Sequence, residues 1–106
     1  MLYTILMHSD GSGQRIFQAE GNDFNDALIR WAGECEIDGL TEPGRQELIE
    51  AMGRLDEDLI RFVSGYNYSE TEYLTNVWRF ERDLDVEGES DHGVETTFLV
   101  IKTAKG

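Results

Sequence analysis

The spacing of hydrophobic residues changes twice along the chain, and this change most constrains the fold. Residues 3–8 and 14–19 fit short strands and are separated by the turn residues Ser9-Asp10-Gly11-Ser12-Gly13, which predicts an N-terminal β-hairpin. From Phe24 to Cys35 the apolar residues recur at steps of three and four, the spacing of an amphipathic helix. Strand-like runs return after residue 72.

Two helices are predicted between the strands. The first begins at Asp23, a suitable N-cap, and is expected to end within residues 33–36. The second begins at Thr41-Glu42-Pro43 because proline is tolerated in a first helical turn. Its apolar face comprises Leu48, Ile49, Met52 and Leu55. Residues 57–63 fit a helical continuation or a short strand equally well.

Two more strands are expected at 73–82 and 94–103. On the first, Leu74, Asn76, Trp78 and Phe80 should share one face. On the second, the run Phe98-Leu99-Val100-Ile101 does not alternate, which predicts a central strand covered on both faces. The order β-β-α-α-β-β predicts one α+β domain over residues 1–106. Its mostly antiparallel four-stranded sheet would carry the helices on one face, with Trp31 and Trp78 in the core.

The net charge of the chain limits the classes of partner that it can bind. The chain of 106 residues carries 22 Asp and Glu against nine Lys and Arg, a net charge of −13. Nucleic acid and anionic membranes need clustered cations and are excluded as partners, whereas a basic protein surface fits. A single cysteine, Cys35, allows no internal disulfide, which is typical of a reducing compartment. Residues 1–7 are too short to span a bilayer, and we expect a cytoplasmic protein.

The first part of the predicted partner-binding site is an acidic segment. Carboxylates alternate at Asp83, Asp85, Glu87, Glu89 and Asp91. In an extended chain these side chains would share a face about 6.6 Å apart and form a ridge roughly 27 Å long. The segment also resembles the start of a calcium-binding loop, with glycine sixth. It departs from that pattern by placing serine eighth and valine twelfth. Cation binding here stays open, and no metal is assigned.

A tyrosine group forms the second part of that site. Tyr66, Tyr68 and Tyr73 lie among acidic residues, and tyrosines surrounded by charge suit a protein interface. The alternative is that the rings fold back to cover the sheet.

Catalytic groups are sparse. His8 ends a strand, His92 lies in the acidic segment, and Cys35 completes the apolar face of a helix, where its thiol would stay neutral. We assign no catalytic residue and no cofactor, and favour a protein that is not an enzyme. One alternative is a small-molecule- or metal-binding domain, which could be an enzyme, with its site between sheet and helices beside Asn76. Another is a homo-oligomer, with a homodimer as its simplest form.

The predicted strand-turn-strand followed by Gly-Asn-Asp-Phe-Asn-Asp-Ala-Leu-Ile, residues 21–29, is similar to the opening of HicB-type antitoxins. The similarity covers about a third of the chain and assigns no residue a role. The charge, the acidic segment and the tyrosines together favour a small acidic binding module. It would be an inhibitor of the immunity or antitoxin kind that occupies a basic surface on a partner protein.

Overall fold

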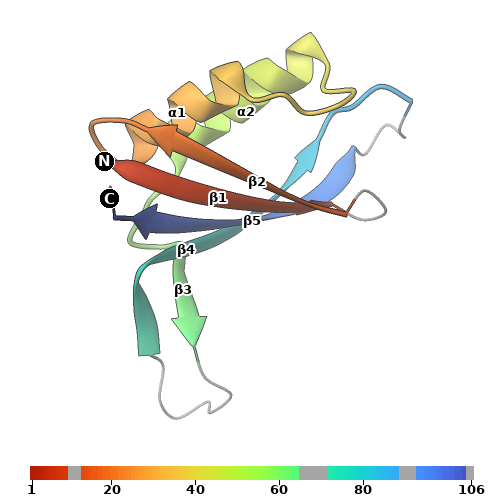
Figure 1. The fold of residues 1–106 in the computed structure, drawn as a ribbon. Helices are drawn as coiled ribbons and strands as arrows, with labels where there is room; N and C mark the ends of the chain where they lie inside the picture. Colours follow the sequence, from red (N-terminus) through yellow and green to blue (C-terminus); the bar gives the residue numbers. More distant parts are fainter. Residues whose placement is uncertain (10–12, 65–71, 89–92, 105–106) are drawn as a thin grey trace.

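The structure is a computed structural model that describes residues 1–9, 13–64, 72–88 and 93–104. Five antiparallel strands form one sheet in the order β2-β1-β5-β4-β3, with both helices on one side (Figure 1). The elements are β1 (Leu2–Ser9), β2 (Gly13–Glu20), α1 (Phe24–Glu34), α2 (Glu42–Arg54), β3 (Arg61–Ser64), β4 (Glu72–Leu84) and β5 (Val94–Thr103).

The predicted α+β class is confirmed, but the sheet has five strands and not four. The additional strand is β3, which begins within residues 57–63, the segment that fits helix or strand equally well from sequence, and ends one residue beyond it. A turn after Asp56, in which the Leu59 and Ile60 amides donate to the Asp56 carbonyl at 3.0 and 3.2 Å, ends the helical period. From Arg61 the chain pairs with β4 and forms a strand of the sheet.

Both helices begin where the sequence predicts. Asp23 caps α1 by accepting a hydrogen bond from the Asp26 amide at 2.8 Å, and Thr41 caps α2 in the same way through the Gly44 amide at 3.0 Å. The apolar stripe of α1 is buried as expected, and Cys35 is its C-cap. On α2, Leu48 and Met52 are buried while Ile49 and Leu55 are partly buried.

Each helix is also anchored by a side chain from the other. The Arg45 guanidinium on α2 donates to the carbonyls of Ala32 and Cys35 at 2.8 and 2.9 Å. Asn25 on α1 donates to the carbonyls of Met52 and Leu55 at 3.0 and 2.9 Å. The last carbonyls of a helix have no partner within the helix. These two side chains therefore satisfy them and fix how α1 and α2 lie together.

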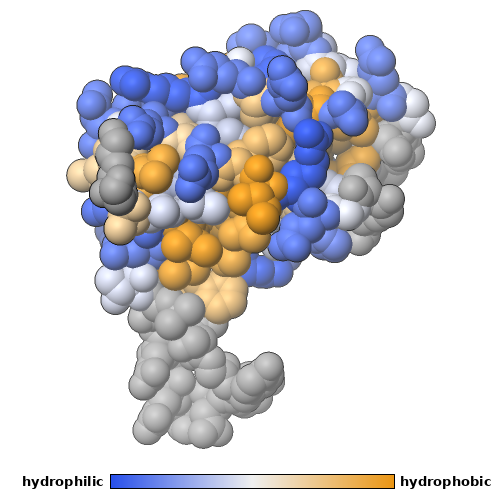
Figure 2. All heavy atoms as spheres, in the orientation of Figure 1, coloured by the Kyte–Doolittle hydropathy of each residue, from blue (hydrophilic) through white to orange (hydrophobic). Residues whose placement is uncertain are grey.

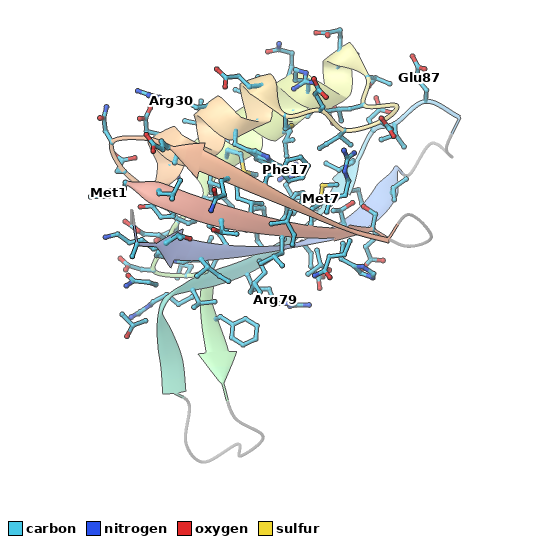
Figure 3. All side chains as sticks on the ribbon, viewed as in Figure 1. Met1, Met7, Phe17, Arg30, Arg79 and Glu87 are labelled. Atoms are coloured by element: carbon cyan, nitrogen blue, oxygen red, sulfur yellow. The ribbon has the colours of Figure 1, made fainter. Side chains whose placement is uncertain are left out.

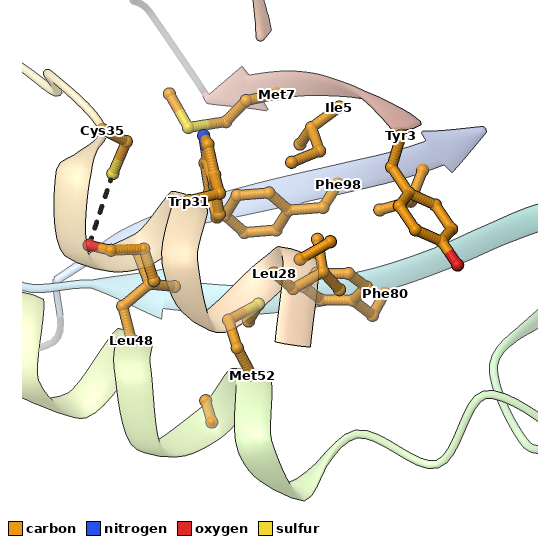
Figure 4. Packing of buried hydrophobic residues seen from close by; sticks show 14 of the residues in the cluster. Tyr3, Ile5, Met7, Leu28, Trp31, Cys35, Leu48, Met52, Phe80 and Phe98 are labelled. Atoms are coloured by element: carbon orange, nitrogen blue, oxygen red, sulfur yellow. Dashed lines mark hydrogen bonds between the residues drawn. The ribbon is translucent and has the colours of Figure 1, made fainter. Parts of the chain in front are cut away.

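Aromatic rings fill the core between helices and sheet (Figure 4). Phe98 stacks on Phe80 with ring centroids 4.9 Å apart and meets the edge of Trp31 at 5.7 Å. Trp78 packs on Phe24 at 4.7 Å. Both tryptophans are buried, as predicted. Within the described residues, the Trp31 indole N–H has no hydrogen-bond partner; its ring nitrogen lies toward Met7 in Figure 4.

β4 is irregular at Asn76. This residue adopts φ 63°, in the left-handed region that asparagine tolerates better than most residues. The β3–β4 register shifts between Arg61 and Val63, and β5 pairs with β4 only from Val77 onward. The irregularity interrupts the alternation of side chains. Asn76 is consequently exposed and does not share the burial of Trp78, which corrects the prediction for this face.

Candidate functional site: the helix-free face of the sheet

The helices cover one face of the sheet, and residues of the described strands occupy the opposite, helix-free face. On β1 the odd-numbered Tyr3, Ile5 and Met7 are buried under the helices, while the even-numbered residues between them are only partly buried. On β5 the even-numbered positions are the buried ones. β5 is central, as predicted, but its expected cover on both faces is wrong, because Leu99 and Ile101 are partly exposed on the helix-free face.

Strand register gathers apolar side chains on this face. Leu6 of β1 lies between Ile16 of β2 and Leu99 of β5. One row along, Ile101 of β5 lies opposite Val77 of β4. We call these five residues the open-face patch. Ile16 is 66% exposed and the other four are partly exposed. Figure 2 shows hydrophobic residues gathered over the strands and bordered by hydrophilic ones.

Carboxylates border one end of the open-face patch. Arg79 and Glu81 follow Val77 along β4 on the same face and form an ion pair at 2.7 Å. Asp83 comes next and pairs directly across from Glu95 of β5. Neither of these two exposed acids forms an ion pair with another described residue. Like charges directly opposite each other destabilise a sheet. This pair leaves a local excess of negative charge beyond the Leu99 end of the open-face patch, with the row of Glu81 and Thr97 between them.

The described part of the acidic segment, residues 83–88, is not one extended stretch. Asp83 ends on the helix-free face, but Asp85 turns to α2: its carboxylate accepts from the Thr41 hydroxyl at 2.8 Å, and its carbonyl accepts from the Thr41 amide at 3.1 Å. The Glu87 amide donates to the Gly39 carbonyl at 2.7 Å. The chain then turns at Gly88, whose φ is 82°. An extended ridge over the whole of 83–91 is therefore not formed.

The remaining predicted site residues are not placed by the structure. Tyr66, Tyr68, Glu89 and Asp91 lie outside the described residues. The backbone of Tyr73 belongs to β4, but its side chain also lies outside them. Of the predicted set, the structure places only Asp83 on the helix-free face, and brings together with it residues that the sequence reasoning missed.

The sequence contains one indication of the open-face patch. The non-alternating run Phe98–Ile101 indicates a strand with apolar side chains on both faces. From the sequence we expected both faces of this strand to be covered, whereas both helices lie on the same face of the sheet (Figure 1). The contributions of Leu6, Ile16 and Val77 depend on which strands pair and in what register.

Nucleophilic and metal-binding groups point to no second site within the described residues. Burial raises the pKa of the Cys35 thiol, and the Arg45 guanidinium opposes this shift only in part, so the buried thiol stays protonated and unreactive near neutral pH. His8 is exposed, and His92 lies outside the described residues. No cluster of potential metal ligands occurs in the part of the chain that is described. There, too, no helix has the length and apolarity required to cross a membrane.

Comparisons with known proteins return no match: no family model, no curated protein and no solved structure matches the chain.

Proposed function

We propose that this protein is a binding module that attaches to a basic partner protein through the helix-free face of its sheet. The open-face patch is the contact, and the carboxylates of Asp83 and Glu95, two rows beyond its Leu99 end on the same face, pair with Lys or Arg on the partner. Tyr66, Tyr68 and Tyr73, together with the acidic residues up to Asp91, belong to the same proposed interface as its peripheral contacts.

The open-face patch carries this proposal. An antiparallel sheet with one covered face normally presents polar side chains to water on the other. Here five apolar residues from four adjacent strands are neighbours on that face. Contiguous exposed apolar residues with a polar border mark interaction sites. Each Å² of apolar surface removed from water contributes about 25 cal/mol to association, before the costs of immobilisation.

Charge selects the partner. Two copies of this chain, each carrying −13, would repel one another, whereas a cationic protein is attracted from a distance and held at the acidic border. A basic partner is therefore favoured over a second copy. An inhibitor of the immunity or antitoxin kind acts in this way, by covering a basic surface that its partner needs.

The proposal is tested by affinity capture with matched variants. Wild type, Ile101→Thr and Ile29→Thr are immobilised and exposed to extract from the source cell at about 50 mM salt, where charge attraction is weakly screened. Ile29 is 36% exposed on α1, so it receives the same substitution away from the helix-free face. Retained proteins are identified, purified and titrated calorimetrically against the three proteins.

A basic protein should bind wild type and Ile29→Thr equally and Ile101→Thr at least tenfold more weakly, a loss of about 1.4 kcal/mol. Its affinity should fall steeply as salt rises. Equal binding by all three proteins would show that the helix-free face is not the binding surface. Binding that is insensitive to salt would show that charge does not select the partner.

A further inference from the structure

β2 is an edge strand whose outer backbone groups can be identified. The Met1 amino group donates to the Gly21 carbonyl at 2.9 Å, and the Gly21 amide donates to the Met1 carbonyl at 3.1 Å. In an antiparallel ladder such mutual pairs recur at every second residue. The odd-numbered residues of β2 therefore bond to β1. The N–H and C=O groups of Gln14, Ile16 and Gln18 face away from the sheet, and no described residue bonds to them.

A groove runs beside this edge. It encloses about 610 Å³ between β2 and α1. Phe17 and Trp31 form its apolar wall, with ring centroids 5.6 Å apart, and Figure 3 shows Phe17 lying toward α1. A strand added to β2 would place alternate side chains in this groove. Its other side chains would continue the open-face patch beyond Ile16.

β2 carries charged side chains only at Arg15 and Glu20 and lacks the other devices that protect an edge strand. It is eight residues long and contains no proline or lysine, and its pairing with β1 runs in one register without a bulge. Natural proteins usually interrupt or charge such an edge because it pairs readily with another chain.

We infer that β2 receives an extended, basic segment of the partner as a sixth strand of the sheet. Main-chain hydrogen bonds to Ile16 and Gln18 supply affinity, and the groove selects the side chains. The inference rests on the proposed function, because that function supplies the basic partner. It adds the form in which the partner binds.

The charges around the groove favour a cationic segment. Glu34 and Glu36 are exposed beside it and form no ion pair with another described residue. Arg45 of α2 already donates to the last carbonyls of α1, so the charge at the groove is set by the side chains that line it. Three carboxylates, Glu20, Glu34 and Glu36, line the groove against two guanidiniums. Of these two, Arg30 pairs with Asp26 at 3.2 Å, and Arg15 lies over the Phe17 ring at 5.5 Å.

The test uses a capped seven-residue peptide of alternating lysine and valine as probe. Gln18→Pro removes one outward N–H, which an edge strand tolerates when that group faces solvent. Gln18→Ala is the matched control, since both variants lose the side-chain bond to the Thr4 hydroxyl and only the first loses the amide. The peptide should bind wild type and Gln18→Ala alike, and Gln18→Pro at least tenfold more weakly.

Two further peptides keep the test valid if Gln18→Pro unfolds. One is N-methylated at every lysine amide and the other at every valine amide, so each loses the hydrogen bonds of one edge only. Exactly one of them should bind wild type. In the wild-type complex, the amides of Ile16 and Gln18 should become protected from hydrogen exchange. Failure of the parent peptide to bind, binding of both methylated peptides, or sedimentation of the free protein as a dimer that Gln18→Pro dissociates would overturn the inference.

The proposed function is judged separately. A basic protein that loses affinity for Ile101→Thr but binds Gln18→Pro like wild type would refute strand addition and leave the helix-free face as the binding surface. Loss of affinity with Gln18→Pro and not with Ile101→Thr would refute the face and leave the edge.

Discussion

Gly44 and Gly53 both lie on α2, but only Gly53 has space for a side chain. A Cβ atom at Gly44 would lie 2.5 Å from the Asp85 carbonyl oxygen and 3.0 Å from the Thr41 hydroxyl. The absence of a side chain therefore lets the chain after β4 approach α2. At Gly53 a Cβ would meet only the end of the Ile29 side chain, at 3.5 Å.

We predict that Gly44→Ala and Gly53→Ala change stability in opposite directions. Gly44→Ala forces backbone apart and should lower the free energy of unfolding by about 1–3 kcal/mol. Gly53→Ala should raise it by up to about 1 kcal/mol, because glycine is a poor helix former. Urea denaturation measures both. Equal effects would show that α2 and the chain after β4 do not approach as described.

The Cys35 thiol should make the free energy of unfolding depend on pH in the alkaline range. Burial raises its pKa above the ordinary value of 9.0, so the folded protein holds the thiol proton more tightly than the unfolded chain does. This contribution is complete below pH 9.0 and is lost as pH rises through the higher folded pKa. Wild type should therefore lose more stability than Cys35→Ala between neutral pH and about pH 10. Parallel stability curves for the two proteins would contradict a raised thiol pKa.

At the scale of elements, the mutual anchoring of α1 and α2 should carry measurable energy. Asn25→Ala leaves two carbonyls at the end of α2 without their donor and should cost about 2 kcal/mol of unfolding free energy. Asn22→Ala is the control, since its exposed side chain makes no hydrogen bond to another described residue. If both variants were equally stable, the carbonyls would be satisfied by water instead.

The paired carboxylates of Asp83 and Glu95 should lower the stability of the fold and strengthen the binding of a basic partner. Glu95→Gln relieves repulsion with Asp83 and should stabilise the fold by about 0.2–1 kcal/mol. The same change should weaken attraction to a basic partner. Thermal denaturation and titration of the captured partner measure the two effects, with Glu47→Gln on the exposed surface of α2 as control. A variant that is more stable and binds equally well would remove these acids from the proposed site.

Local patterns predicted individual elements well because their causes are local. Asp23 and Thr41 cap the helices through residues three positions away, and the stripe from Phe24 depends only on helical period. β3 was ambiguous because its pairing with β4 decides its conformation. The irregularity at Asn76 was hidden for the same reason. The open-face patch joins the N-terminal hairpin to β4 and β5, which are distant from it in sequence, so no local pattern could assemble it.

For the molecule as a whole, two features act together: a net charge of −13 and a sheet covered by helices on one face only. Under the proposed function, charge keeps copies of this chain apart and the uncovered apolar face binds another protein. The proposed function assigns the attraction of a basic partner to Asp83 and Glu95, on the same face as the open-face patch. The account depends most on that location.

Site-specific photo-crosslinking in the source cell tests it most directly. A photoreactive benzoylphenylalanine replaces Ile101 in one protein and Ile29 in another, so that the same probe lies on the helix-free face or on α1. The account predicts that illumination joins a basic protein to the probe at position 101 and not to the probe at position 29. Equal crosslinking at the two positions, or crosslinking at position 101 only to a second copy of this chain, would contradict it.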